Sequence, residues 1–381
     1  MTTMAIDNKD KKVLNVPHLR FPEFSGEWKK HSLGEIGETI IGLTYKPSDV
    51  VDNNGIIVFR SSNIKNGMID YSDLVRVNKH IKDKIITKEN DILVCARNGS
   101  QRLIGKNAII KQEDANNTFG AFMMVYRAND NPFILPLLST KKYFSQVGEN
   151  LGARINQITT SDFNGFEFYF PENHAERTKI AELFRLLDER IATQNKIIDK
   201  LQSLIKGIAQ NITCSNKPNV HISECLECSS STLQESDVCE NGAYPVYGAN
   251  GVVGYLNYYN TLSEAIYIIK DGSGVGTVSY VTGKCSPTGT LNILQVKDGY
   301  SLRYLYYLLK VFNFEPYKTG MAIPHIYFKD YGKAKIFCPQ YSEQLKYATL
   351  LFTIDDKLST EQEILKSLNL EKQYLLRQMF I

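Results

Sequence analysis

Two long stripes of apolar residues, 167 positions apart, constrain this chain most. In the first, apolar residues recur at alternating spacings of four and three over 180–212, with a polar interruption at Gln194. Adding 167 gives a second stripe over 347–379, with Glu361 in the matching polar position and Lys372 as one further exception. Heptad stripes are typical of helices that pack against a partner helix. The sequence therefore predicts two long helices that pack against each other.

The two stripes belong to an internal duplication. Six residues are identical between 176–193 and 343–360. The segments before the helices also match, at an offset of 168. Further upstream, glycines of the two halves match only if the offset between them changes from pair to pair. This predicts loops of unequal length on a shared scaffold. These pairs are Gly99 with Gly272, Gly105 with Gly276, and Gly120 with Gly289.

The duplication predicts an α+β fold. We expect two β-rich domains, each followed by a long α-helix, with the helices packing as an antiparallel coiled coil related by a pseudo-twofold axis. The expected segments are an N-terminal tail (1–16), a first domain (17–171), a first helix (172–212), a linker (213–219), a second domain (220–339) and a second helix (340–381).

Short β-type runs separated by Asn, Gly and Asp turns fill both domains. In the first domain we expect strands at 55–59, 91–96, 107–110 and 119–126, and a helix at 133–147. In the second domain we expect strands at 244–247, 265–269, 277–281 and 291–296, and a helix at 302–312.

Composition agrees with two packed domains. The chain has 381 residues, 43% of them apolar, which is enough for two cores plus the helices. A net charge of +3 permits a nucleic-acid partner without arguing for one. The seven cysteines are odd in number and scattered, and no run resembles a signal peptide or a membrane span. We expect a reduced, cytoplasmic protein with no membrane partner.

Motifs that would indicate catalysis are incomplete. The run 99–106 resembles a phosphate-binding loop but has one residue too many between its glycines, and it lacks the Ser or Thr that ligates magnesium. The glycines of 272–276 fit a tight turn better than a dinucleotide fingerprint. The run 130–133 has one proline where the base-holding loop of adenine methyltransferases has two. Cys225 and Cys228 lack a second pair, and the histidines show no ligand spacing. We expect no catalytic residue and no metal site.

Polar side chains that can read base edges follow the predicted strands. Arg, Asn, Gln and Lys carry the donors and acceptors that discriminate bases in the major groove, while Ser and Tyr serve phosphates or stacking. Exposed loops are polar in general, so a solvated loop is the simpler explanation of any single residue. The candidate DNA contacts are Arg60, Ser62, Asn63, Arg97, Asn98, Gln101, Arg102, Arg154 and Gln157 in the first domain, and Tyr247, Asn250, Lys270, Ser273 and His325 in the second.

Four runs together form a distinctive combination: 176–191 and its twin 343–358, the opening run 19–28, and the run 244–251. With these runs, the chain from about residue 17 to 381 resembles the specificity subunit of type I restriction-modification systems, and the twin runs look like the two spacer helices of that family. The resemblance carries over no base-contact residue, because the recognition domains diverge within the family.

The resemblance implies a non-catalytic chain that recognises double-stranded DNA. Each domain would read one half of a bipartite site, and the helices would set the gap. It also implies methyltransferase subunits that carry S-adenosylmethionine, and motor-nuclease subunits that use ATP and magnesium. No cofactor is expected on this chain itself.

Charged residues off the stripes are candidates for subunit docking. A solvated helix face is the simpler explanation, but the duplication of several of these residues favours two methyltransferase subunits, one per repeat. The candidates are Glu176, Lys179, Asp188 and Arg190 on the first helix, and Glu343, Lys346, Asp355 and Lys357 on the second.

Two other functions remain open. A coiled-coil scaffold whose β-rich modules bind protein or glycan would suit the many tyrosines of the second half, and it predicts no salt-dependent DNA binding. A self-sufficient DNA methyltransferase would require the base-holding loop and the nucleotide fingerprint that this sequence lacks.

Overall fold

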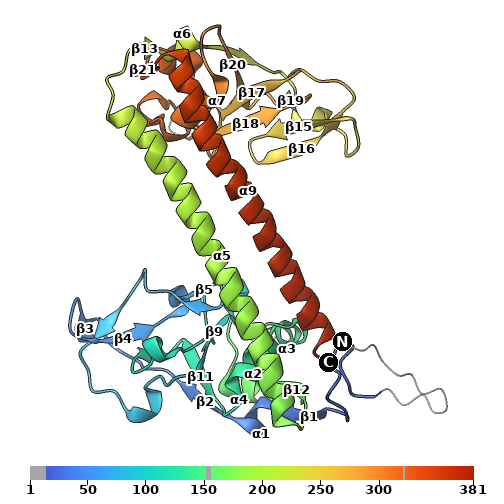
Figure 1. Ribbon diagram of the computed structural model, residues 1–381. Helices are drawn as coiled ribbons and strands as arrows, with labels where there is room; N and C mark the ends of the chain where they lie inside the picture. The colour runs from blue at the N-terminus through green and yellow to red at the C-terminus, as the bar shows by residue number, and fades with distance from the viewer. Residues whose placement is uncertain (1–13, 152–155, 321) are drawn as a thin grey trace, which may run out of the picture. The chain divides into compact units, whose positions relative to one another are not determined.

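The computed structural model describes residues 14–151, 156–320 and 322–381. The chain divides into two compact units, one formed by residues up to Thr193 together with Leu365–Ile381, and the other by Gln194–Ile364. The two predicted long helices are α5 (His174–Cys214) and α9 (Tyr341–Gln378), and both units contain part of each (Figure 1).

Unit 1 is built on two four-stranded sheets. The first has the order β2 (Glu38–Ile41), β11 (Met123–Arg127), β8 (Ile92–Cys95) and β9 (Asn107–Ile109), with all neighbours antiparallel. The second has the order β10 (Thr118–Phe119), β4 (Ile56–Phe59), β7 (Arg76–Val77) and β3 (Val50–Val51), and its β10–β4 pair is parallel. Two hairpin-sized sheets pair β1 (Lys29–Ser32) with β12 (Glu167–Phe170) and β5 (Ile64–Lys65) with β6 (Met68–Ile69).

The predicted strand over 119–126 is wrong in one respect. A turn over residues 120–122 interrupts it, closed by the Met123 amide, which donates to the Gly120 carbonyl at 2.8 Å. The turn places Phe122 at the surface, 59% exposed.

The helices of unit 1 are short except for α5 and α9. They are α1 (Leu33–Ile36), α2 (Asn131–Leu137), α3 (Lys141–Leu151) and α4 (Thr160–Asn164). The single helix predicted over 133–147 is wrong, because the chain breaks between α2 and α3. Thr140 explains the break: its hydroxyl donates to the Leu137 carbonyl at 2.7 Å and accepts from the Tyr143 amide at 3.3 Å, ending one helix and capping the next.

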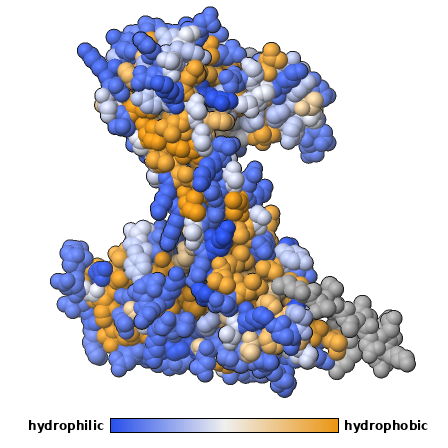
Figure 2. Space-filling view, in the orientation of Figure 1, coloured by the Kyte–Doolittle hydropathy of each residue, from blue (hydrophilic) through white to orange (hydrophobic). Residues whose placement is uncertain are grey.

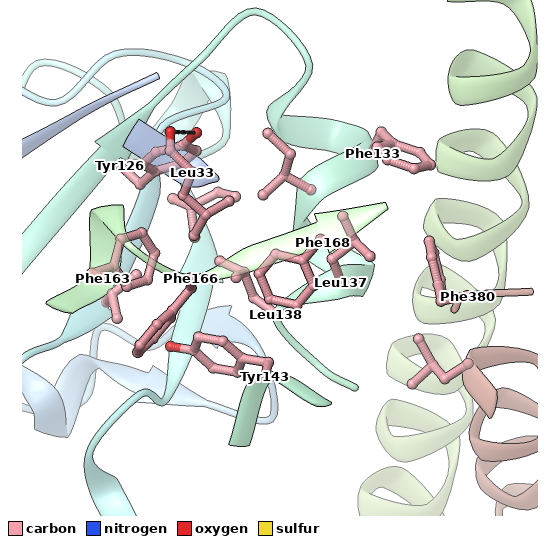
Figure 3. Close-up of a cluster of buried hydrophobic side chains, with 14 of the residues drawn as sticks. Leu33, Tyr126, Phe133, Leu137, Leu138, Tyr143, Phe163, Phe166, Phe168 and Phe380 are labelled. Carbon is pink, nitrogen blue, oxygen red and sulfur yellow. Dashed lines mark hydrogen bonds between the residues drawn. The ribbon is translucent and has the colours of Figure 1, made fainter. Parts of the chain in front are cut away.

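An aromatic core fills unit 1 and includes the ends of both long helices. Figure 3 shows Tyr126, Tyr143, Phe163 and Phe166 grouped together, and the Tyr126 hydroxyl donates to the Leu33 carbonyl at 2.8 Å. Two residues beyond the end of α9, the Phe380 ring lies 5.6 Å from that of Phe184 on α5 and 6.3 Å from that of Trp28. The helix ends are therefore integral to this core.

The N-terminal part of unit 1 binds the helix pair through a buried ion pair. Arg20 donates two hydrogen bonds of 2.7 Å to the Glu176 carboxylate, which is fully buried. The Trp28 indole donates to the same carboxylate at 3.3 Å. On α9, the Gln378 carbonyl accepts from the Leu19 amide at 2.8 Å.

Unit 2 contains one four-stranded and one three-stranded sheet. The first has the order β14 (Leu226–Ser230), β20 (Leu291–Val296), β17 (Glu264–Ile269) and β18 (Val278–Thr282), all antiparallel. The second has the order β16 (Gly251–Leu256), β15 (Tyr244–Gly248) and β19 (Ser286–Pro287), and its β15–β19 pair is parallel. A small sheet pairs β13 (Val220–His221) with β21 (Lys335–Ile336), and the helices are α6 (Ile222–Cys225), α7 (Leu302–Val311) and α8 (Phe328–Tyr331).

Short 3-10 helices connect these elements in both units. They are Pro47–Asp49, Ser61–Asn63, Asp83–Ile85, Gln101–Leu103, Gln112–Asp114, Glu235–Asp237 and Glu315–Tyr317.

The two units repeat one topology. The order β2-β11-β8-β9 corresponds to β14-β20-β17-β18, and each unit also has a sheet with one parallel pair. Gly105 and Gly276, matched in the sequence, both have positive φ, 80° and 89°. Their amides donate at 2.9 Å to the last carbonyl of β8 and of β17, respectively. The loops closed in this way are residues 96–104 and 270–275, so the second is three residues shorter.

Contacts between α5 and α9 occur within each unit. In unit 1, Lys372 donates to Asp188 at 2.5 Å. In unit 2, the buried Gln194 amide donates to the Glu361 backbone carbonyl at 2.9 Å and to its carboxylate at 2.5 Å. The matching polar positions of the two stripes, Gln194 and Glu361, thus face each other. Among the described residues, no helix is both long and apolar enough to cross a membrane.

Candidate nucleic-acid interface

The loop after β8 presents a stacked arginine in unit 1. Arg97 is exposed, and its guanidinium carbon lies 5.1 Å from the centre of the Phe122 ring. The Phe122 carbonyl accepts from the Ala96 and Arg97 amides, both at 3.0 Å. The exposed Gln101 and Arg102 follow in the same loop. The loop therefore carries two arginines, and one of them, Arg97, packs on an aromatic ring from the turn before β11.

A second segment closes against this loop. Arg97 and Gln157 form an antiparallel bridge, and the Ile158 amide donates to the Ala96 carbonyl at 2.9 Å. Asn156 donates from its side chain to the Gly99 carbonyl at 3.0 Å. The structure thus brings Gln157 to Arg97, as a shared reading surface requires, whereas the predicted contact Arg154 lies outside the described residues.

A third segment, which directly follows β4, is hydrogen-bonded to the same loop. Asn98 donates from its side chain to the Ser61 hydroxyl at 2.8 Å. Arg60 forms an ion pair of 2.8 Å with Asp73. A hydrogen bond from the exposed Ser62, and then the charge of Arg60, lower the pKa of the Asp73 carboxyl below its ordinary value. Arg60 is therefore partly neutralised within the chain.

Asn63 corrects the prediction of a DNA contact. Its side chain is fully buried. Its oxygen accepts from the Arg60 amide at 2.9 Å, and its nitrogen donates to the Asp70 and Asp73 carbonyls at 3.0 and 2.8 Å. Asn63 satisfies backbone groups of its own loop, which leaves it no surface for a base.

In unit 2, the loop after β17 meets His325. The Asp271 carboxylate lies 2.6 Å from the His325 Nδ1, and the two residues form an antiparallel bridge. The Lys270 carbonyl accepts from the Ile326 amide at 2.9 Å. Ser273 is exposed in the same loop. The predicted residues Lys270, Ser273 and His325 therefore gather around Asp271.

The other predicted contacts of unit 2 come from a different sheet. Asn250 is exposed in the turn between β15 and β16. Tyr247 is half-buried on β15, with its ring 6.1 Å from that of Tyr267 on β17. Burial raises the pKa of Tyr247 above its ordinary value. Tyr247 therefore packs on a neighbouring strand.

The segments that resemble catalytic motifs connect strands or hydrogen-bond to the backbone of their own unit. The run 99–106 lies in the connection between strands β8 and β9, and 272–276 joins β17 to β18, so neither leads from a strand into a helix. In the run 130–133, Asn131 is buried and donates to the Asn90 and Tyr126 carbonyls, both at 2.8 Å. Within the described ranges, no group of three or more His, Cys, Asp or Glu side chains is placed to hold a metal ion.

Comparison with known proteins decides the family. The type I restriction modification DNA specificity domain matches residues 25–203 and 219–370. The chain belongs to this family.

Individual members of the type I specificity family are distant relatives. The EcoKI specificity subunit of Escherichia coli K12 is 25% identical over 193 residues, 49% of this chain and 41% of the relative. A putative type I specificity subunit of Mycoplasma genitalium is 25% identical over 252 residues, 60% of this chain and 65% of the relative. The aligned parts thus span less than two thirds of each relative's length.

A crystal structure of a type I specificity subunit shares the fold. The S subunit from M. genitalium aligns with 96% of this chain and 99% of its own length, with a TM-score of 0.68 and 20% identity. The two-domain α+β architecture is therefore that of a solved member of the type I specificity family.

Several charged residues predicted to dock type I partner subunits are engaged inside the chain. Glu176, predicted on an outer face, is instead buried against Arg20. Asp188 pairs with Lys372, and Asp355 accepts from the Tyr307 hydroxyl at 3.1 Å. Lys179 is exposed, pairs with Glu23 and lies 4.5 Å from the centre of the Phe21 ring. The predicted residues Arg190, Glu343, Lys346 and Lys357 are exposed.

Exposed apolar residues on α5 and α9 were missed by reasoning from charge. Large apolar side chains normally face a core or a partner, so their exposure on helices indicates candidate docking surface. Figure 2 shows apolar residues at the surface of the helices. They are Leu186 and Leu204 on α5, and Tyr341, Leu345, Leu350, Phe352, Ile364, Leu370 and Tyr374 on α9.

Proposed function

We propose that this chain is the DNA sequence-recognition subunit of a type I restriction-modification complex, and that each unit reads one half of a bipartite site on double-stranded DNA. The observation that carries the proposal is the repeat of one strand order in two units whose strand-end loops differ in length and in polar side chains. A shared scaffold with different loops suits two readers of different sequences.

The long helices are proposed to form an antiparallel coiled coil with pseudo-twofold symmetry that sets the gap between the half-sites. The contacts Asp188–Lys372 and Gln194–Glu361 support it, because the partner's number falls as the number on α5 rises. Helices of 41 and 38 residues span roughly 60 Å at about 1.5 Å per residue. A rigid spacer of this length gives a gap of fixed size.

The helices are also proposed to dock two methyltransferase subunits, one per repeat. Apolar side chains such as Leu186 and Leu350, 51% and 50% exposed, could anchor partners, with nearby charged residues at the rim. In this proposal S-adenosylmethionine is carried by the methyltransferases, and ATP and magnesium by motor-nuclease subunits. The chain itself is non-catalytic and holds no cofactor.

DNA titration with the purified complex tests this function. The chain is co-purified with its methyltransferase, and fluorescent duplexes containing the motif found by genome-wide methylation mapping are titrated at several salt concentrations. We expect sequence-specific binding that weakens steeply with salt, because phosphate contacts release counterions. The chain without its partner should methylate nothing.

Two outcomes would replace the proposal. Methylation by the chain alone would indicate a self-sufficient methyltransferase. Absence of salt-dependent DNA binding in the complete complex, together with an unchanged methylation map in a host lacking the chain, would favour a scaffold that binds protein or glycan.

A further inference from the structure

The same set of backbone hydrogen bonds closes the end of one strand in each unit, β8 in unit 1 and β17 in unit 2. In unit 1, the Ala96 amide donates to the Phe122 carbonyl at 3.0 Å, and the Ala96 carbonyl accepts from Ile158 at 2.9 Å. In unit 2, the Lys270 amide donates to the Thr290 carbonyl at 3.0 Å, and the Lys270 carbonyl accepts from Ile326 at 2.9 Å. We call this arrangement the strand-end platform; it comprises residues 96, 97, 122, 157 and 158 in unit 1, and 270, 271, 290, 325 and 326 in unit 2.

Corresponding positions of the platform carry different side chains. The antiparallel bridge joins Arg97 to Gln157 in unit 1 and Asp271 to His325 in unit 2. The first platform therefore presents a guanidinium, which only donates hydrogen bonds. The second presents a carboxylate, which only accepts when ionised. One backbone frame thus displays opposite hydrogen-bonding chemistry in the two units.

The platform holds these side chains ready for a ligand. Residues 97 and 271 each follow directly on a residue whose amide and carbonyl are both hydrogen-bonded. Arg97 is exposed and stacks on Phe122, and Asp271 is 36% exposed beside His325. Side chains fixed before binding lose little conformational entropy when they bind. Asn98 is fastened as well, by its amide to the Asn156 carbonyl at 3.3 Å and by its side chain to the Ser61 hydroxyl at 2.8 Å, and its amide side chain is thereby partly used within the chain.

His325 leaves acceptors on the second platform. The Nδ1 of His325 lies 2.6 Å from the Oδ1 of Asp271. The carboxylate has two oxygens, and His325 is paired with Oδ1, so Oδ2 can accept from another donor.

We propose that residues 97 and 271 are specificity-determining positions, with Arg97 reading a guanine in one half-site and Asp271 reading a cytosine in the other. An arginine guanidinium matches the O6 and N7 acceptors of guanine, and a carboxylate accepts from the N4 amino group of cytosine. The assignment rests on the proposed DNA-recognition function and names the bases that each unit selects.

Single substitutions in the complete methyltransferase complex test the assignment. Wild type, Arg97→Gln and Asp271→Asn are compared by methylation mapping and by titration of duplexes with one base pair changed. We expect Arg97→Gln to abolish the preference for one guanine in one half-site, where wild type discriminates by about 5- to 150-fold. Asp271→Asn should do the same for one cytosine in the other half-site. Each variant should leave the opposite half-site unchanged.

Control variants distinguish a loss of base recognition from a loss of folding. Lys82→Gln and Asp298→Asn each remove a charge at an exposed residue that is not a candidate DNA contact, and we expect them to leave the motif unchanged. Thermal melting and co-purification with the methyltransferase establish that each variant is folded, and if Asp271→Asn fails to assemble, the wild-type motif decides for unit 2.

Different failures have different meanings. A wild-type complex without sequence-specific binding would refute the proposed function. A wild-type bipartite motif that Arg97→Gln leaves intact, or that Lys82→Gln also relaxes at that guanine, would refute only the assignment. A half-site without a guanine on one side, or without a cytosine on the other, would also overturn it.

Discussion

At the scale of single residues, the pair Arg20–Glu176 links the N-terminal segment to α5. Both hydrogen bonds are 2.7 Å, and the carboxylate is fully buried. We predict that Arg20→Met destabilises unit 1 by about 3–5 kcal/mol, because a buried carboxylate is left without its cation. Urea unfolding followed by the fluorescence of Trp28, the one tryptophan of the chain, measures the change.

A surface pair in the same unit provides the control. Lys29 and Glu172 are each 63% exposed, so Glu172→Gln should change the free energy of unfolding by less than about 1 kcal/mol. The double variant Arg20→Met/Glu176→Leu should recover much of the lost stability, since it removes both charges. An Arg20→Met midpoint equal to wild type would show that the buried pair is not structurally important.

Glu176 also shows what the sequence could have revealed. It lies four residues before Ile180, and residues four apart share a face of a helix, so Glu176 lies on the same side of α5 as the first residue of the stripe. Its charge and its duplication suggested an outer face instead. Asn63 is a different case, because no local pattern tells whether a loop asparagine binds a ligand or, as here, satisfies the backbone of its own loop.

At the scale of elements, the helix stripes were predictable because one periodicity is sustained over many turns and occurs twice. Leu187 packs against the core of unit 1, and Leu201 is half-buried on the same stripe. We predict that Leu187→Asp/Leu201→Asp separates α5 from α9 and abolishes both assembly and methylation, because a buried unpaired carboxylate costs several kcal/mol. Light scattering of the co-purified complex and a methylation assay measure the two effects.

The matched control for the helix seam is Ser203→Asp, which adds the same charge at an exposed position of α5. It should assemble normally. A normal complex from the double aspartate variant would contradict a seam between these helices.

The docking surface gives a second prediction for the helices. Leu186→Glu and Leu350→Glu place charges on exposed apolar positions in units 1 and 2, respectively. We expect each to weaken the binding of one methyltransferase by about tenfold or more, and the pair together to prevent binding at both sites. Native mass spectrometry counts the bound subunits.

Lys366→Glu, an exposed charge reversal on α9, serves as the docking control and should keep two subunits. A wild-type complex with one methyltransferase per chain would exclude the symmetric arrangement. The sequence suggested charged docking residues because charge is readable in a sequence, whereas an exposed leucine on a stripe-bearing helix is identified only once burial is known.

At the scale of the whole molecule, two different readers on a fixed spacer predict a bipartite site that can be altered one half at a time. Replacing residues 220–339 with the matching domain of a relative should change one half-site and keep the other half and the gap. Inserting one heptad into both helices adds about 10 Å and should lengthen the gap by about three base pairs. Methylation mapping of both variants measures the outcome.

The same measurement can contradict the two-reader arrangement. A domain exchange that rewrites both halves would do so, as would a continuous or palindromic wild-type site. The duplication behind this prediction was visible in the sequence as matched glycines and matched helix stripes, but the loop geometry was not. Phe122, for example, lies within an apolar run that reads as strand, and only the turn at 120–122 brings it under Arg97.

The unequal loops closed by Gly105 and Gly276 have an evolutionary consequence. Each loop is fastened at both ends by backbone hydrogen bonds, and the two already differ by three residues on equivalent frames. A short insertion or deletion among the exposed residues between the fastened ends, away from core residues such as Ile104, leaves the strands where they are. Under the proposed function, the heritable unit of change in this scaffold is therefore smaller than a domain: a few codons in one loop would be enough to give a lineage a new target.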